Sequence, residues 1–215
     1  MYDIILFDLD GTVTDPKPGI TKSVQYALGK MGIVEDDLEK LTTFIGPPLT
    51  TSFKEFYHMN DEEANQALQY YRERFSTVGL YENAVYEGMK ELLEKLQAQG
   101  KTIFVATSKP TIFSVKILEH FGLIDFFKAV IGSELDGTRV EKSEVIEYVL
   151  AQIEDHKSRK IIMVGDRKFD IIGAQENDID VIGVSYGYGS CDELILAKPN
   201  YIVSTVSELE GILCR

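Results

Sequence analysis

The chain has 215 residues, of which 44% are hydrophobic and 27% charged, a composition that excludes a disordered or fibrous protein. Its 22 Lys and Arg residues face 35 Asp and Glu residues, and the resulting net charge of −13 argues against nucleic-acid binding. No apolar run approaches the roughly 20 residues that span a bilayer, and the start of the chain lacks a secretory signal. We therefore expect a cytoplasmic protein without a membrane partner.

Five short apolar runs rich in Ile and Val have the pattern of parallel strands that are covered on both faces. They are YDIILF at 2–7, KTIFVAT at 101–107, KAVIG at 128–132, KIIMVGD at 160–166 and DVIGVSYG at 180–187. Segments with helical spacing of apolar residues alternate with these runs, at 88–100, 110–122 and 142–153. The alternation predicts an α/β fold with a doubly wound, Rossmann-like parallel sheet.

Residues 15–83 break this alternation. They contain candidate helices at 20–31, 36–44, 49–57 and 61–78, a turn FIGPPL at 44–49, and no convincing strand. We therefore expect two domains, an α/β core formed by residues 1–14 and 84–215 and an inserted helical domain at 15–83.

Acidic side chains follow two of the predicted strands. Asp8 and Asp10 end the first strand in the stretch FDLDGTVTD, and Asp166 and Asp170 follow the strand at 160–166. Ligands of such sheets bind at the carboxyl ends of the strands, where these carboxylates would repel one another in a partly dehydrated cleft. A hard divalent cation removes this repulsion, and Mg²⁺ prefers carboxylate oxygens together with a substrate phosphate.

With a cation in place, the neighbouring polar groups acquire chemical roles. Asp8 can attack a phosphoryl group and form an aspartyl-phosphate, while Asp10 can move protons to the leaving oxygen and from water. Thr107 and Ser108 end the strand at 101–107, and Lys142 begins a predicted helix. These three residues can hold the phosphate oxygens on which charge must be stabilised.

Each feature alone also has a structural interpretation. Asp8 and Asp10 would suit a turn, and Thr107-Ser108-Lys109-Pro110 resembles an ordinary helix N-terminus. A single lysine such as Lys142 is usually solvated. The ordered set, with each member at a strand end or a helix start, favours a phosphoryl-transfer site.

Four motifs in this order resemble those of the haloacid dehalogenase superfamily, in its phosphatase branch. They are DLDGTVTD, VATSKP, the lysine of RVEKSEVI, and VGDRKFD. The insertion resembles the cap domain of the phosphoglycolate phosphatase-like group. DPKPGITKSVQYAL, IGPPL, GSELDGTR and GYGSCDEL are similar to a bacterial subgroup labelled phosphoglycolate phosphatase or 5'-nucleotidase.

The resemblance implies that Asp8 is the nucleophile, that Asp10 is the acid and base, and that Thr107 and Lys142 bind the phosphoryl group. It implies a magnesium site made of Asp8, the backbone carbonyl of Asp10, Asp166 and Asp170, the last directly or through water.

The implied partner is a small phosphorylated metabolite, with phosphoglycolate, a nucleoside 5'-monophosphate and a sugar phosphate all open. Gly46 and Pro47 form a turn that could approach the substrate, although a plain turn between two helices fits the same residues. The sequence indicates no oligomeric state.

Four other functions fit part of this pattern. A signalling receiver domain would have its lysine on a later strand than its threonine and would lack the insertion, whereas in this chain acids follow the lysine. A dehalogenase would not need Asp10. A phosphomutase of the β-phosphoglucomutase type usually has a histidine after the first motif, where this chain reads DPKPGITKSV. A non-enzymatic phosphate-sensing module should have lost a motif residue. A Mg²⁺-dependent phosphatase of small phosphomonoesters remains the preferred prediction.

Overall fold

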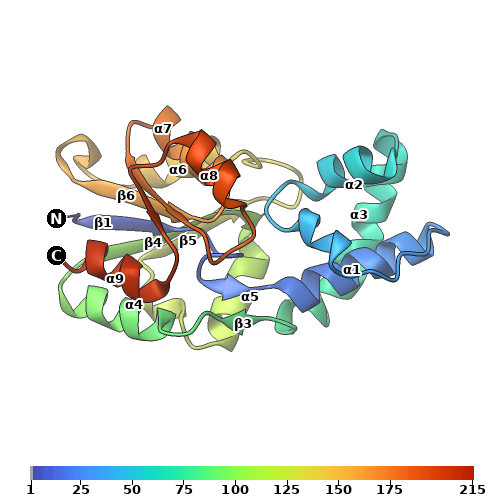
Figure 1. The fold of residues 1–215 in the computed structure, drawn as a ribbon, viewed down its shortest axis with the longest axis horizontal. Coiled ribbons are helices and arrows are strands. Elements are labelled where there is room, and N and C mark those ends of the chain that lie inside the picture. Colours follow the sequence, from blue (N-terminus) through green and yellow to red (C-terminus); the bar gives the residue numbers. More distant parts are fainter. Residues whose placement is uncertain (1) are drawn as a thin grey trace. The chain divides into compact units, whose positions relative to one another are not determined.

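The structure, a computed structural model, describes residues 2–215 and divides them into two compact units (Figure 1). Unit 1 comprises the chain up to Asp15 together with Val85–Arg215, and unit 2 comprises Pro16–Ala84. Each boundary lies one residue beyond the expected one. The chain passes between the units in β2 (Thr14–Asp15) and β3 (Ala84–Val85), which pair as a two-stranded sheet.

Unit 1 contains a six-stranded parallel sheet, which confirms the predicted fold class. The strands lie in the order β5-β4-β1-β6-β7-β8, so β1 and β6 are central. Their bounds are β1 Ile4–Phe7, β4 Thr102–Pro110, β5 Ala129–Ser133, β6 Ile161–Gly165, β7 Asp180–Val184 and β8 Tyr201–Val203. Strand β8 was not predicted, because it has only three residues and two of them are exposed.

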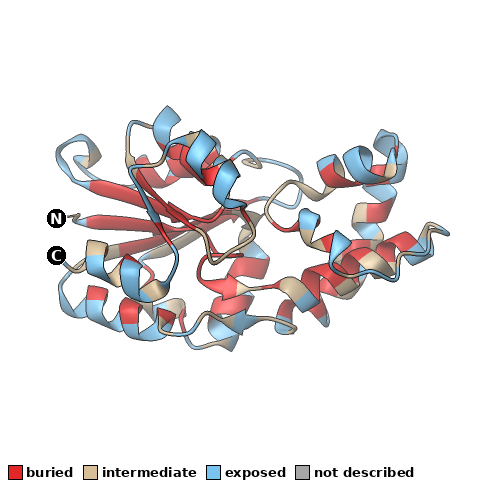
Figure 2. Ribbon diagram, viewed as in Figure 1, coloured by how far each residue is buried: buried red, intermediate tan, exposed pale blue. Residues whose placement is uncertain are grey.

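Helices cover both faces of this sheet (Figure 1). One face carries α4 (Met89–Ala98), α5 (Thr111–His120) and α9 (Val206–Leu213), and the other carries α6 (Lys142–Leu150), α7 (Lys168–Glu176) and α8 (Cys191–Ala197). Strands β1 and β6 are buried along their whole length, as Figure 2 shows. Such strands must be apolar on both sides, which is why their sequences read as continuous Ile, Leu and Val runs. Across residues 2–215, no helix is both long enough and apolar enough to cross a membrane.

The strand register determines which residues meet at the carboxyl edge of the sheet. Phe7 at the end of β1 lies beside Val105 of β4 and Val164 of β6. The residues that follow these three positions are therefore neighbours at this edge, although β4 itself continues to Pro110. They belong to the first, second and fourth sequence motifs.

Unit 2 is helical, with α1 (Lys17–Lys30), α2 (Leu49–Tyr57), α3 (Asp61–Phe75) and two short 3-10 helices, η1 (Lys40–Phe44) and η2 (Gly79–Tyr81). Helix α3 begins with a reciprocal cap, because Asn60 accepts from the Glu63 amide and the Glu63 carboxylate accepts from the Asn60 amide.

The helix expected at 36–44 is wrong over its first half. Only Lys40–Phe44 is helical, and it is a 3-10 turn. The preceding backbone instead bonds to acidic side chains, since the Asp37 amide donates to Glu35 and the Glu39 amide donates to Asp37. Such local side-chain bonds compete with helix formation.

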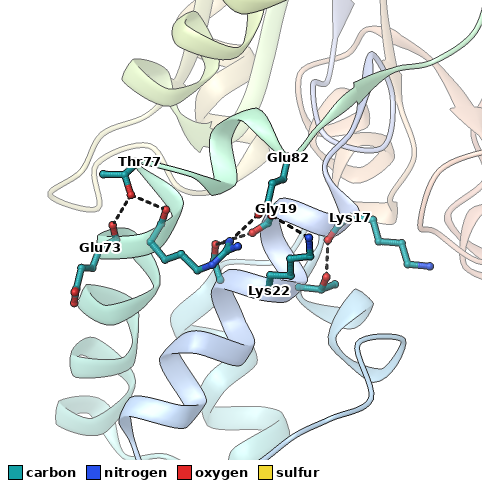
Figure 3. Close-up of polar contacts among 9 residues, drawn as sticks. Lys17, Gly19, Lys22, Glu73, Thr77 and Glu82 are labelled. Atoms are coloured by element: carbon teal, nitrogen blue, oxygen red, sulfur yellow. Dashed lines mark hydrogen bonds and ion pairs between the residues drawn. The ribbon is translucent and has the colours of Figure 1, made fainter.

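A polar network joins α1 to the end of unit 2 (Figure 3). The Glu82 carboxylate accepts from Lys22 at 3.0 Å and from Arg74 at 2.8 Å. The Gly19 amide donates to the Glu82 carbonyl at 2.9 Å, and a Cβ on Gly19 would lie 2.1 Å from the Gly79 carbonyl oxygen. The backbones can approach this closely because Gly19 has no side chain.

Two glycines on α1 should therefore respond to alanine in opposite directions. Gly19→Ala should lower the free energy of unfolding by about 1–3 kcal/mol, because its Cβ overlaps backbone atoms that cannot move freely. Gly29→Ala is the matched control, since nothing lies within 4 Å of its Cβ position, and it should raise stability by about 0.5–1 kcal/mol. Urea unfolding measures both, and equal effects would contradict the close contact.

Candidate active site

The segment after β1 turns sharply at Gly11 and brings two aspartates to the edge of the sheet. The Asp8 amide donates to the Val164 carbonyl of β6 at 2.8 Å, and Gly11 has a positive φ of 82°. A Cβ on Gly11 would lie 2.2 Å from Oδ2 of Asp166. Glycine is required here for the backbone angle and for the close packing against Asp166.

Three buried carboxylates gather at this edge. One carboxylate oxygen each from Asp8, Asp166 and Asp170 lies within 4.8 Å of the others, and the residues are 5%, 0% and 1% exposed. Burial, followed by repulsion from Asp170 and Asp8, raises the pKa of Asp166 well above its ordinary range. Burial likewise raises the pKa of Asp170 to about 6, although Lys142 opposes the shift.

Lys142 lies among these acids. Its Nζ is 2.8 Å from Oδ1 of Asp8 and 2.8 Å from Oδ1 of Asp170, and it donates to the Ala106 carbonyl at 3.1 Å. Burial alone would lower the pKa of Lys142, but the two carboxylates outweigh it and raise this pKa above its usual range. The residue is 5% exposed, so the interpretation as a solvated surface lysine is wrong.

Asp10 has a cationic partner that the sequence analysis did not assign, Lys109. Lys109 Nζ lies 2.5 Å from Oδ2 of Asp10 in a largely buried ion pair. Burial raises the pKa of Asp10, and Lys109 lowers it in part. The strand is irregular between Ala106 and Pro110, so simple alternation of side chains does not predict where Lys109 points.

Thr107 and Ser108 lie within β4, which continues to Pro110. They therefore do not cap a helix, since α5 begins only at Thr111 and its first turn accepts no side-chain cap. Thr107 is 2% exposed, and its Oγ1 accepts from the Lys109 amide at 3.3 Å. The Ser108 carbonyl accepts from the Ser133 hydroxyl at 2.7 Å.

The loop after β7 is packed against Asp166. The Tyr188 amide donates to Oδ2 of Asp166 at 2.7 Å, and a Cβ on Gly187 would lie 2.4 Å from the Cβ of Asp166. The Tyr188 hydroxyl donates to Asp15, and the Tyr186 hydroxyl donates to the Thr12 carbonyl at 3.0 Å. The loop thus binds both Asp166 and the segment that follows Gly11.

When all four carboxylates are ionised, Asp8, Asp10, Asp166 and Asp170 outnumber the cations Lys109 and Lys142 by two charges. Within residues 2–215, Oδ1 of Asp166 and Oδ1 of Asp10 are buried and accept no hydrogen bond. Buried acceptors without donors and an uncompensated negative charge suit a divalent cation, so the oxygen-only donor set of Asp8, Asp166 and Asp170 could hold one.

The turn residues Gly46 and Pro47 belong to unit 2. Gly46 has a positive φ of 107° and lies between η1 and α2. A role of Gly46 and Pro47 toward a substrate stays a prediction.

The family model of haloacid dehalogenase-like hydrolases matches residues 5–184. The chain therefore belongs to the haloacid dehalogenase-like hydrolase family, as the four motifs predicted.

Several relatives have names that describe phosphoryl chemistry. The chain is 48% identical to a 5'-nucleotidase of Pseudomonas aeruginosa, over 99% of this chain and 96% of that protein. It is 34% identical to the tyrosine-protein kinase PtkA of Mycobacterium tuberculosis (98% and 72%) and 28% identical to a phosphoglycolate phosphatase of Yersinia pseudotuberculosis (95% and 90%). A crystal structure of a protein from Clostridium acetobutylicum, described as a predicted phosphatase, superimposes with a TM-score of 0.92 at 48% identity, over 98% of this chain and 97% of that one. The expected enzyme class, a phosphoric monoester hydrolase, is supported by the names of the first and third relatives.

Removing the Lys142 ammonium should destabilise the protein in a pH-dependent way. Lys142→Met leaves two buried carboxylates without their cation, which should lower the free energy of unfolding by about 3–5 kcal/mol at pH 8. Protonation of these carboxylates removes the cost of burying their unpaired charges. The pKa of Asp170 is about 6 in the folded protein, above its unfolded value, so stability lost at high pH returns as the pH falls.

The measurement is urea unfolding in EDTA at pH 8 and pH 5. The loss should be smaller at pH 5 than at pH 8. Lys116→Met, which removes an exposed lysine of α5, is the control and should change stability little at either pH. An equal loss for Lys142→Met at both pH values would contradict the proposed charge balance.

Proposed function

We propose that this protein is a magnesium-dependent phosphatase that hydrolyses small phosphomonoesters through an aspartyl-phosphate on Asp8. The observation that carries the proposal is the position of Asp8 at the end of the central strand, 2.8 Å from the Lys142 ammonium and within a buried carboxylate cluster. A carboxylate held beside a cation at this edge is placed to attack a bound anionic group.

Mg²⁺ would be held by Asp8, Asp166 and Asp170, with the backbone carbonyl of Asp10 as a further ligand. When bound, it would neutralise charge on the phosphoryl oxygens and help to orient them. The Tyr188 amide, which binds Asp166, would keep that carboxylate oriented, because a ligand with a fixed hydrogen bond loses less freedom on binding a metal.

The proposed reaction has two displacement steps. A carboxylate oxygen of Asp8 forms a bond to phosphorus while the bond to the leaving oxygen breaks, and Asp10 gives its proton to that oxygen. Asp10 then takes a proton from the water that attacks the aspartyl-phosphate, which releases inorganic phosphate and restores Asp8. Burial raises the pKa of Asp10, which suits a group that must begin as an acid.

Three residues would bind the phosphoryl oxygens. Lys142 already lies beside Asp8, and Thr107 and Ser108 are on β4, the strand adjacent to β1. Hydroxyl, amide and ammonium donors in a site with little water stabilise the charge that develops on these oxygens.

For the substrate we favour a nucleoside 5'-monophosphate, because the relative with 48% identity over nearly both full lengths is a 5'-nucleotidase. Phosphoglycolate is the second candidate and rests on the 28% identical relative. We propose unit 2 as the cap domain expected from the family resemblance, with Gly46 and Pro47 as candidate selectivity residues.

Replacing Asp8 should abolish turnover without loss of the fold. With Mg²⁺ present, Asp8→Asn should release p-nitrophenol from p-nitrophenyl phosphate at least about 10³-fold more slowly, and EDTA should stop the wild-type enzyme. Asp10→Asn should slow release by about 10²-fold, because proton transfer is lost while the nucleophile remains.

Asp192→Asn, which changes an exposed carboxylate of α8, is the control and should keep the wild-type rate. Circular dichroism verifies that each variant is folded. A folded Asp8→Asn variant with near wild-type turnover would rule out the mechanism.

A comparison of substrates should rank nucleoside 5'-monophosphates first. The measurement is kcat/KM for release of inorganic phosphate from AMP, IMP, UMP, phosphoglycolate and glucose 6-phosphate at one Mg²⁺ concentration, with a preference of about tenfold or more. Free phosphate is the readout because transfer to another hydroxyl, as in a mutase or a kinase, releases none. A higher value for phosphoglycolate would reverse the order of the two candidates.

A further inference from the structure

Unit 1 contains a hollow at the opposite edge of its sheet from the carboxylates. Its volume is about 770 Å³, within the roughly 300–1,000 Å³ typical of small-molecule sites. The first residues of β6, β7 and β8 line it, as does Tyr2 just before β1. The strands are parallel, so these are their amino ends, whereas Asp8 and Asp166 follow their carboxyl ends.

The wall of the hollow is basic in an otherwise acidic chain. Its cationic side chains are Lys157, Arg159, Lys160 and Arg215, with His156 beside them. In the described part of the chain, residues 2–215, none of these five side chains forms an ion pair with an acid. The four Lys and Arg side chains outnumber the acidic side chains of the wall, Asp178 and Asp180, in a chain of net charge −13. Such a reversal of the local field attracts anions.

One of the two acids is already engaged by neighbouring groups. Asp180 accepts from the Tyr2 hydroxyl at 2.7 Å and from the Asn200 amide group at 2.9 Å. The side-chain oxygen of Asn200 in turn accepts from the backbone amide of Val181 at 2.8 Å. The backbone amide of Asn200 donates to the Val181 carbonyl at 3.0 Å. This side of the hollow is therefore held in place before any ligand arrives, which lowers the entropy cost of binding.

The remaining wall is aromatic and aliphatic. Tyr2 and Tyr201 contribute rings, and Ile161, Ile179 and Ile212 contribute aliphatic side chains. Tyr201 is 44% exposed, so a face of its side chain is available to a ligand. A flat heterocycle can stack on such a ring, while Arg159 and Arg215 offer forked donors that match phosphate oxygens.

We propose that this hollow binds a nucleotide carrying two or more phosphates, at a site distinct from the carboxylates. Several unpaired cations suit an anion of several charges, and the tyrosines suit its base. The chain has a net charge of −13, which would repel a nucleic-acid strand that extended beyond the hollow. The site would allow a nucleotide to bind this protein without entering the proposed phosphatase site.

The test is calorimetric titration of the protein with ADP in EDTA, a condition that does not favour anion binding beside the carboxylates. One ADP should bind per chain, and the affinity should fall as salt is raised from 50 to 300 mM. In Arg159→Gln/Lys160→Gln the affinity should drop by about tenfold or more, because two charges beside the phosphates are lost. Tyr201→Ala should weaken the binding of ADP without weakening the binding of pyrophosphate.

Two controls separate this site from general electrostatics and from the carboxylate edge. Lys90→Gln/Lys116→Gln also removes two exposed positive charges from unit 1 and should bind ADP like the wild type. Thr107→Ala, at the opposite edge of the sheet, should also leave ADP binding unchanged.

Three results would overturn the proposal. They are equal ADP affinity in wild type and Arg159→Gln/Lys160→Gln, loss of ADP binding in Thr107→Ala, and pyrophosphate binding as tight as ADP binding. The last would mean that the base makes no contribution. None of these results bears on whether Asp8 is a nucleophile, so the two proposals fail separately.

Discussion

Burying several carboxylates at one end of a parallel sheet costs free energy, and much of the local structure offsets this cost. Asp8, Asp166 and Asp170 are almost inaccessible to water, and their mutual repulsion adds to the desolvation of each charge. The Lys142 ammonium compensates for two of them at 2.8 Å. The proposed cation would offset more of this cost, because buried carboxylates without a partner destabilise the folded protein.

The fold could be predicted because β1 and β6 are covered on both faces and must be apolar along their whole length. Strand β8 escaped prediction because an edge strand of three residues, two of them exposed, has no such constraint. The helix expected at 36–44 fails in its first part, because the acidic side chains of Glu35 and Asp37 bond to the local backbone there. The spacing of apolar residues predicts which side of a helix or strand is buried. It does not predict hydrogen bonds from side chains to the local backbone.

The candidate site could be predicted to the same degree and for a related reason. Parallel strands bring their carboxyl ends together, so the proximity of Asp8 and Asp166 follows from the strand pattern. Lys142 begins a helix, and its place beside Asp8 was expected only from the order of the motifs. Lys109 could not be assigned in this way, because its role depends on the direction of a long side chain toward Asp10. The hydrogen bond from the Tyr188 amide to Asp166 could not be predicted either, because it depends on the conformation of a loop that no residue pattern specifies.

The glycines around Asp166 carry a consequence for engineering. A Cβ at Gly11 or Gly187 would lie within 2.5 Å of Asp166 atoms, and one at Gly189 would lie 1.9 Å from its carbonyl oxygen. Three separate backbone segments therefore share one volume that admits no side chain. A loop transplanted from a relative to alter this enzyme must carry its glycines at matching positions, and the first and fourth motifs must be exchanged together with the loop after β7 as one block.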